Sequence, residues 1–201
     1  QYHQPHTCRD DRRFYFITSG KVQYVARVGN FIDNGADYTG ALQILKVILS
    51  YDYLWQNIRV KGGAYGCMSG FSRTGEGYFV SYRDPNLERT MEVYEGIADY
   101  LRNFTVSDRD MNKYIIGTMS NIDQPMTPSA KGDRSFNLYM NKVSAETIKK
   151  ERLQILEAGQ EDIRKLADVV EAVMKAEQVC VIGSEEKIEE AKDMFKNVTT
   201  F

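Results

Sequence analysis

A short polar stretch, residues 59–66 (RVKGGAYG), brings a cation, a double glycine and a phenol close together in the sequence. The guanidinium of Arg59 offers a planar fork of donors to a peptide carbonyl or carboxylate. A phenol with an ordinary pKa of about 10 stays protonated near neutral pH and can donate to an oxyanion, and Tyr65 supplies a phenol. The pair is therefore suited to binding a peptide backbone and stabilising an acyl-transfer transition state.

Each member of this stretch also has a simpler structural explanation. Arg59 ends a predicted helix, where a cation interacts favourably with the helix dipole, and Tyr65 also fits an ordinary strand aromatic. Gly62 and Gly63 are typical of a helix C-cap. A glycine-rich turn holds phosphate when it precedes a helix, whereas this one follows a helix, so we expect no nucleotide site.

A second candidate is the pattern H-x-x-H-x-C at His3, His6 and Cys8, whose residue types suit zinc. These are the only histidines in the chain, and they lie in a polar segment without a periodic element. We interpret this segment as a solvated tail and expect no metal site in this chain. No Gly-x-Ser-x-Gly motif is present and no histidine lies in a predicted element, which argues against a serine or cysteine nucleophile.

Composition narrows the function classes further. The chain has 201 residues, 42% of them hydrophobic, which is enough for one domain with a core. A net charge of −2 argues against nucleic-acid binding through bulk charge. No apolar run approaches the roughly 18 residues that a membrane span requires. The three widely spaced cysteines favour free thiols in a reducing compartment.

Hydrophobic periodicity predicts the elements that must position Arg59 and Tyr65. Residues 21–31 alternate like a half-buried strand. From residue 38 a long helix ends near Arg59, and residues 64–72 and 78–82 form a strand pair. The predicted inward face of that helix comprises Ala41, Leu42, Leu45, Ile48, Leu49 and Trp55.

The rest of the chain is predicted to be mostly helical. One helix follows Asp84-Pro85-Asn86, with Arg83 and Asp84 as its cap, and another begins at Ser107. Further helices are expected over about 131–142, 145–157 and 161–176, then a buried strand at 179–182 and a last helix capped by Ser184. We predict an α+β fold whose mostly antiparallel sheet is covered on one face by helices. Residues 1–13 are expected to form a flexible lead-in and residues 14–201 a single domain.

From about Gln23 onward the chain resembles the last domain of the pitrilysin/insulinase-type zinc metallopeptidases, in the presequence protease branch. Residues 59–66 and the motif SYRDPNL at 81–87, in this order and spacing, carry the resemblance most specifically. Shorter matches are Gly29-Asn30-Phe31, Gly40-Ala41-Leu42, Leu54-Trp55 and Ile116-Gly117-Thr118.

The resemblance implies the α/β roll of that family, in which four homologous domains enclose a peptide chamber. The first domain binds zinc on an H-x-x-E-H motif, and the last supplies an Arg and a Tyr to the substrate. By motif match these are Arg59 and Tyr65, with Tyr65 stabilising the tetrahedral intermediate. Gly62 and Gly63 are assigned to substrate binding with them.

This chain has no H-x-x-E-H motif. We therefore expect the C-terminal domain of a larger zinc metalloendopeptidase acting on unstructured peptides, inactive alone and without a cofactor of its own. The resemblance implies zinc in the N-terminal domain, and that domain and the peptide as partners, rather than nucleic acid or membrane. Isolated, the domain is expected to form a homodimer through its uncovered surfaces. The expected compartment is a bacterial cytoplasm, with an organelle matrix as the alternative.

Two other function classes remain open at this point. One is a non-catalytic structural or peptide-binding homologue of the same fold, although a purely structural subunit need not keep both Arg59 and Tyr65. The other is an unrelated binding module whose turn happens to match. Exposure of both side chains on one surface would favour the peptidase interpretation, whereas burial of both would overturn it.

Overall fold

The computed structural model describes residues 13–191 and 197–200. Its six-stranded sheet has the order β3-β4-β2-β5-β1-β6. The strands are β1 (Arg13–Thr18), β2 (Gln23–Asn30), β3 (Gly66–Phe71), β4 (Glu76–Asp84), β5 (Gln178–Ser184) and β6 (Asn197–Thr200). Neighbours from β3 to β5 pair antiparallel, and β1 pairs parallel with β5 and β6. The predicted mostly antiparallel sheet is confirmed.

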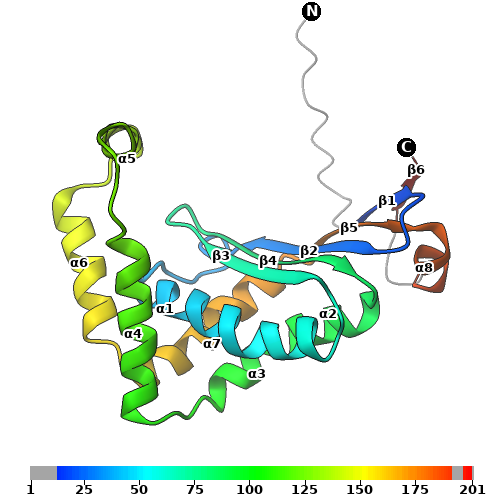
Figure 1. Ribbon diagram of the computed structural model, residues 1–201, viewed down its shortest axis with the longest axis horizontal. Coiled ribbons are helices and arrows are strands. Elements are labelled where there is room, and N and C mark those ends of the chain that lie inside the picture. Colours follow the sequence, from blue (N-terminus) through cyan, green and yellow to red (C-terminus); the bar gives the residue numbers. More distant parts are fainter. Residues whose placement is uncertain (1–12, 192–196, 201) are drawn as a thin grey trace, which may run out of the picture.

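Helices cover one face of this sheet, as predicted, and the part of the chain that the structure describes leaves the other face open (Figure 1). Because the covered face is apolar, the core lies between it and the helices beneath. The helical elements are α1 (Ala41–Ile48), η1 (Leu49–Tyr53), η2 (Trp55–Val60), α2 (Leu87–Glu95), α3 (Ile97–Arg102), α4 (Asp108–Ile122), α5 (Pro128–Met140), α6 (Ala145–Leu156), α7 (Gln160–Met174) and α8 (Glu185–Glu190).

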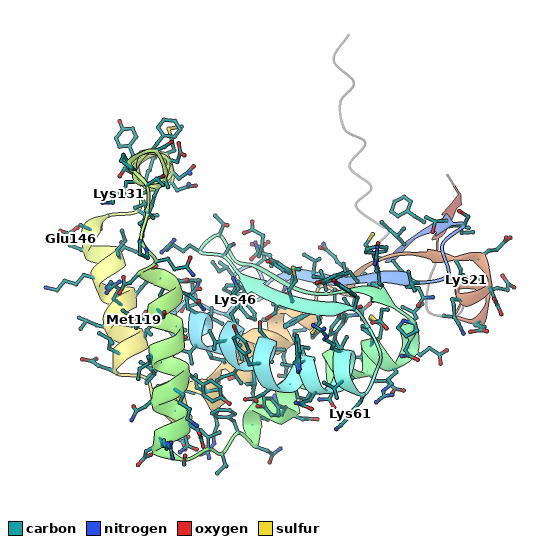
Figure 2. All side chains as sticks on the ribbon, viewed as in Figure 1. Lys21, Lys46, Lys61, Met119, Lys131 and Glu146 are labelled. Atoms are coloured by element: carbon teal, nitrogen blue, oxygen red, sulfur yellow. The ribbon has the colours of Figure 1, made fainter. Side chains whose placement is uncertain are left out.

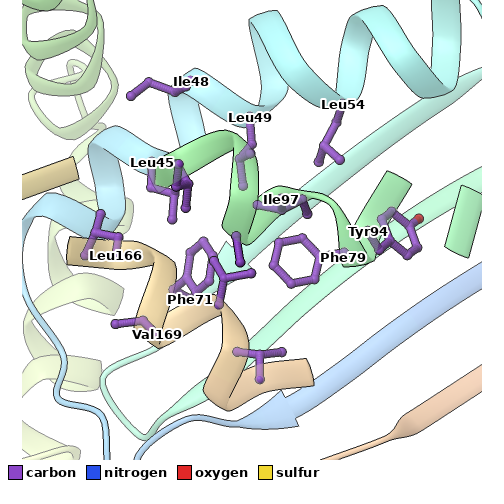
Figure 3. Close-up of a cluster of buried hydrophobic side chains, with 14 of the residues drawn as sticks. Leu45, Ile48, Leu49, Leu54, Phe71, Phe79, Tyr94, Ile97, Leu166 and Val169 are labelled. Carbon is purple, nitrogen blue, oxygen red and sulfur yellow. The ribbon is translucent and has the colours of Figure 1, made fainter. Parts of the chain in front are cut away.

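The core joins the long helix to strands β3 and β4 (Figure 3). Phe79 is fully buried, and its ring centre lies 5.9 Å from that of Phe71 and 5.9 Å from that of Tyr94. Leu49 and Leu54 face these rings from the helix. This packing fixes the helix against the hairpin, and the residues around Arg59 and Tyr65 form the connection between the two.

The long helix departs from the prediction in its second half. After α1 its backbone N–H groups bond five residues back, as Leu54 N–H does to Leu49 O and Lys61 N–H to Gln56 O. This π-helical spacing widens the turn and shifts which positions face the core. Leu54 and Ile58 are buried instead of Trp55, which is 37% exposed, so the predicted inward position of Trp55 is wrong.

Most other predicted elements are confirmed. The Ser107 hydroxyl accepts the N–H of Asp110 at 3.2 Å and caps α4. The strand at 179–182 is half-buried rather than buried, because Ile182 faces the open side of the sheet. The proposed zinc-ligand types His3, His6 and Cys8 lie outside the described residues. None of the described helices is long and apolar enough to cross a membrane.

Candidate functional site

The turn after η2 is a helix C-cap, as its double glycine predicts. The N–H of Gly63 donates to Arg59 O at 2.9 Å, and the N–H of Ala64 donates to Ile58 O at 3.1 Å. Gly63 has φ +78°, in the left-handed region that favours glycine. A Cβ on Gly62 would overlap the carbonyl of Ile58. Both glycines are therefore explained by the geometry that turns the chain from Arg59 to Tyr65.

The second motif, residues 81–87, holds this turn in place. The amide of Asn86 donates to Gly62 O, and the guanidinium of Arg89 donates to Lys61 O at 3.1 Å. Asp84 is fully buried, and its carboxylate accepts the hydroxyl of Thr90 at 2.7 Å and the N–H of Asn86 at 2.9 Å. Because buried polar groups need partners, these bonds fix the start of α2 against the turn. Lys61 marks this turn at the end of the helix in Figure 2.

The structure brings Arg59 and Tyr65 together on the surface. Both are exposed, Tyr65 by 60%, and the guanidinium carbon of Arg59 lies 6.0 Å from the centre of the Tyr65 ring. The same carbon lies 4.1 Å from the centre of the Trp55 ring, a cation–π contact that orients the guanidinium. The exposure of Trp55 thus has a local role, which is to hold Arg59 beside Tyr65.

Arg83 is a third member of this cluster that sequence reasoning missed. It was predicted to cap α2, but its guanidinium carbon lies 5.6 Å from the centre of the Tyr65 ring. Its carbonyl accepts the N–H of Tyr65 at 3.3 Å. Its φ of +49° is left-handed, which costs a non-glycine residue about 1–3 kcal/mol and persists only where surrounding contacts impose it. The hairpin register, Gly66 opposite Tyr82, could have placed Arg83 next to Tyr65.

We expect Gly63→Ala to lower the free energy of unfolding by about 1–2 kcal/mol, because alanine is strained at this positive φ. Gly63→Asn should lose less, since asparagine adopts the left-handed region more readily than alanine. Urea unfolding of the two variants and the unaltered chain measures both differences. Equal stability of all three would contradict the conformational role of Gly63.

Other groups near the turn offer little reactive chemistry. Cys67 lies on β3, two residues after Tyr65, and burial raises the pKa of its thiol to about 11. The thiol is therefore protonated near neutral pH and is a poor nucleophile. Within the described residues no group of three or more His, Cys, Asp and Glu side chains is arranged to hold a metal. The guanidinium and phenol groups of this surface can bind a ligand by donating hydrogen bonds to its oxygen atoms.

A model of the PreP C-terminal domain family matches residues 13–186. The curated relatives include Protein HypA of Clostridium perfringens, 47% identical over 90% of this chain and 19% of that protein. Presequence protease 1, chloroplastic/mitochondrial, of Arabidopsis thaliana is 33% identical over 88% of this chain and 16% of that protein. The chain thus spans less than a fifth of the length of either relative.

Solved structures share the fold. Pitrilysin matches with a TM-score of 0.61 at 13% identity, covering 95% of this chain and 22% of that chain. A protease from Helicobacter pylori matches with a TM-score of 0.64 at 14% identity, covering 85% and 43%. A peptidase M16 inactive domain from Pseudomonas fluorescens matches with a TM-score of 0.57 at 16% identity, covering 86% and 43%. At these identities the likeness concerns the fold alone.

Proposed function

The chain belongs to the family of PreP C-terminal domains of insulinase-type metallopeptidases, and we propose that it supplies Arg59 and Tyr65 to a peptide bound at the zinc site of another domain. The observation that carries this proposal is that the two exposed side chains converge at one turn. The guanidinium carbon of Arg59 lies 6.0 Å from the centre of the Tyr65 ring. The hydrogen bonds from residues 84–89 that fix this turn support the proposal, because a binding site needs rigid support.

In this proposal each residue acts on one part of the substrate. Zinc bound by another domain would supply the activated water. The Tyr65 hydroxyl donates to the carbonyl oxygen as negative charge develops on it. The Arg59 guanidinium, oriented by Trp55, donates to a neighbouring carbonyl and holds the backbone in place. Gly62 and Gly63 then contribute by allowing the backbone to turn beside the substrate.

This chain has exposed apolar surfaces that another domain could contact. The open sheet face carries a shallow apolar depression of about 400 Å³ lined in part by Tyr24, Met68 and Ile182. Every residue of α5 is exposed or half-buried, including Phe136 and Tyr139 at 63% and 80% exposure. We propose that the remaining domains of the same polypeptide cover such surfaces. Self-association of the isolated domain and a bacterial cytoplasmic location remain predictions.

Peptide hydrolysis tests this function directly. A peptidase chain that includes this domain should cleave an unstructured fluorogenic peptide, and a chelator should abolish the cleavage. The 201-residue chain alone should cleave nothing above background. Chelator-sensitive cleavage by the purified 201-residue chain, with contaminating protease excluded, would overturn the proposal.

A non-catalytic peptide-binding or structural homologue is the second candidate. The description of one structural neighbour as an inactive domain favours it, although that likeness concerns only the fold. The same assay separates the two candidates: if the longer chain binds peptide but does not cleave it, the non-catalytic function replaces the peptidase.

A further inference from the structure

Two guanidinium groups converge on one phenol in this structure. The guanidinium carbons of Arg59 and Arg83 lie 6.0 Å and 5.6 Å from the centre of the Tyr65 ring. Within residues 13–191 and 197–200 neither forms an ion pair with a carboxylate, whereas other arginines do, among them Arg73, Arg102, Arg152 and Arg164. The cluster is therefore a local excess of positive charge.

The adjacent acid does not neutralise this charge through a salt bridge. Asp84 is fully buried, and its carboxylate is bonded to the Thr90 hydroxyl and the Asn86 N–H. Lys61 is exposed in the same turn and adds a further cation. The exposed cations Arg59, Arg83 and Lys61 favour an anion at the surface beside Tyr65.

The position of Arg83 is imposed by the fold. Its carbonyl accepts the N–H of Tyr65, and its left-handed backbone lies within the last two residues of β4, directly before the buried Asp84. A neutral peptide carbonyl suits one guanidinium, whereas a carboxylate has two oxygens and a charge that a pair of guanidinium groups can share.

We propose that Arg83 joins Arg59, beside the Tyr65 ring, in a binding site for a carboxylate of the peptide. The proposal rests on the peptide-binding function above and adds the chemical class of the group that is bound. The carboxylate comes either from the C-terminus of the peptide or from an Asp or Glu side chain, and the experiment below distinguishes these sources.

Trp55 is the only tryptophan in the chain and contacts Arg59, so its fluorescence reports on this site. The 201-residue chain is titrated with three N-acetylated Gly/Ala/Ser peptides without aromatic residues, and calorimetry repeats each titration. One peptide has a free C-terminal carboxylate, one is amidated, and one is amidated with an internal Glu. We expect at least one carboxylate peptide to bind about tenfold tighter than the neutral amide, with a preference that falls as salt increases. Whichever carboxylate peptide shows the preference identifies the source.

Three variants test whether Arg83 causes the preference for the carboxylate peptide. Arg83→Asn removes the charge while tolerating the left-handed backbone, and it should remove the carboxylate preference. Arg83→Lys should keep part of it, because the charge remains without the planar fork. Arg109→Gln, at an exposed arginine of α4, removes one charge elsewhere and should leave the preference unchanged.

Three results would overturn the proposal: equal affinity for all three peptides, an undiminished preference in Arg83→Asn, or no binding of any peptide. Equal affinity would leave the peptide-binding function intact and remove only the carboxylate site. The peptidase function is judged separately by the chelator-sensitive cleavage assay, so its failure and the failure of this proposal are distinguishable.

Discussion

Replacing Tyr65 with phenylalanine in a peptidase that contains this domain is expected to lower kcat by roughly 10²–10³, the usual effect of removing one oxyanion donor. The ring contacts of Tyr65 with Arg59, Arg83 and Tyr82 do not need the hydroxyl, so the site should keep its shape. KM and zinc content should change little, since the hydroxyl acts mainly in the transition state. Steady-state kinetics with a fluorogenic peptide and metal analysis measure these quantities.

Tyr139→Phe is the matched control, because it removes a hydroxyl from an exposed tyrosine of α5. Its kcat should equal that of the unaltered enzyme. An unchanged kcat in Tyr65→Phe would remove the Tyr65 hydroxyl from the mechanism, whereas equal losses in both variants would indicate a general effect on the protein.

Phe79→Ala is expected to lower the free energy of unfolding by about 3–5 kcal/mol, the usual cost of emptying a buried aromatic site. Phe79 is fully buried between Phe71 and Tyr94, where the hairpin meets the helices. Urea unfolding followed by circular dichroism should show a lower midpoint with a similar slope.

Phe136→Ala provides the comparison, because Phe136 is 63% exposed on α5 and its loss should cost no more than about 0.5 kcal/mol. If Phe79→Ala lost no more stability than Phe136→Ala, the packing between the hairpin and the helices would not be the principal core of the domain.

Local patterns predicted much of this fold. The strand-like runs at residues 64–72 and 78–82 indicated the β3–β4 hairpin, and Ser107 indicated the start of α4. Strands β1 and β6 had no counterpart among the predictions. The pairing of β1 with β5 joins residues such as Phe16 and Ile182, which lie far apart in the sequence. Such a pairing depends on tertiary packing, which local periodicity does not encode.

The candidate site was predicted only in part, because local sequence patterns do not show which distant residues pack together. Arg59 and Tyr65 were identified as candidates because they belong to one short stretch of sequence, and their functional role stays a prediction. Arg83 was missed because its position beside Tyr65 depends on the register of β3 with β4. Trp55 was placed on the wrong face because an α-helical period was assumed where the backbone bonds are π-helical. Both errors concern backbone geometry rather than residue type.

The change in bonding after Ile48 also makes the direction of Arg59 depend on chain length. An α-helix turns by about 100° per residue, and a π-helix turns by less. Adding or deleting one residue between Ile48 and Gly62 would therefore rotate the guanidinium away from Tyr65 even if every side chain were kept. In this segment the number of residues carries functional information that a comparison of residue types alone would miss.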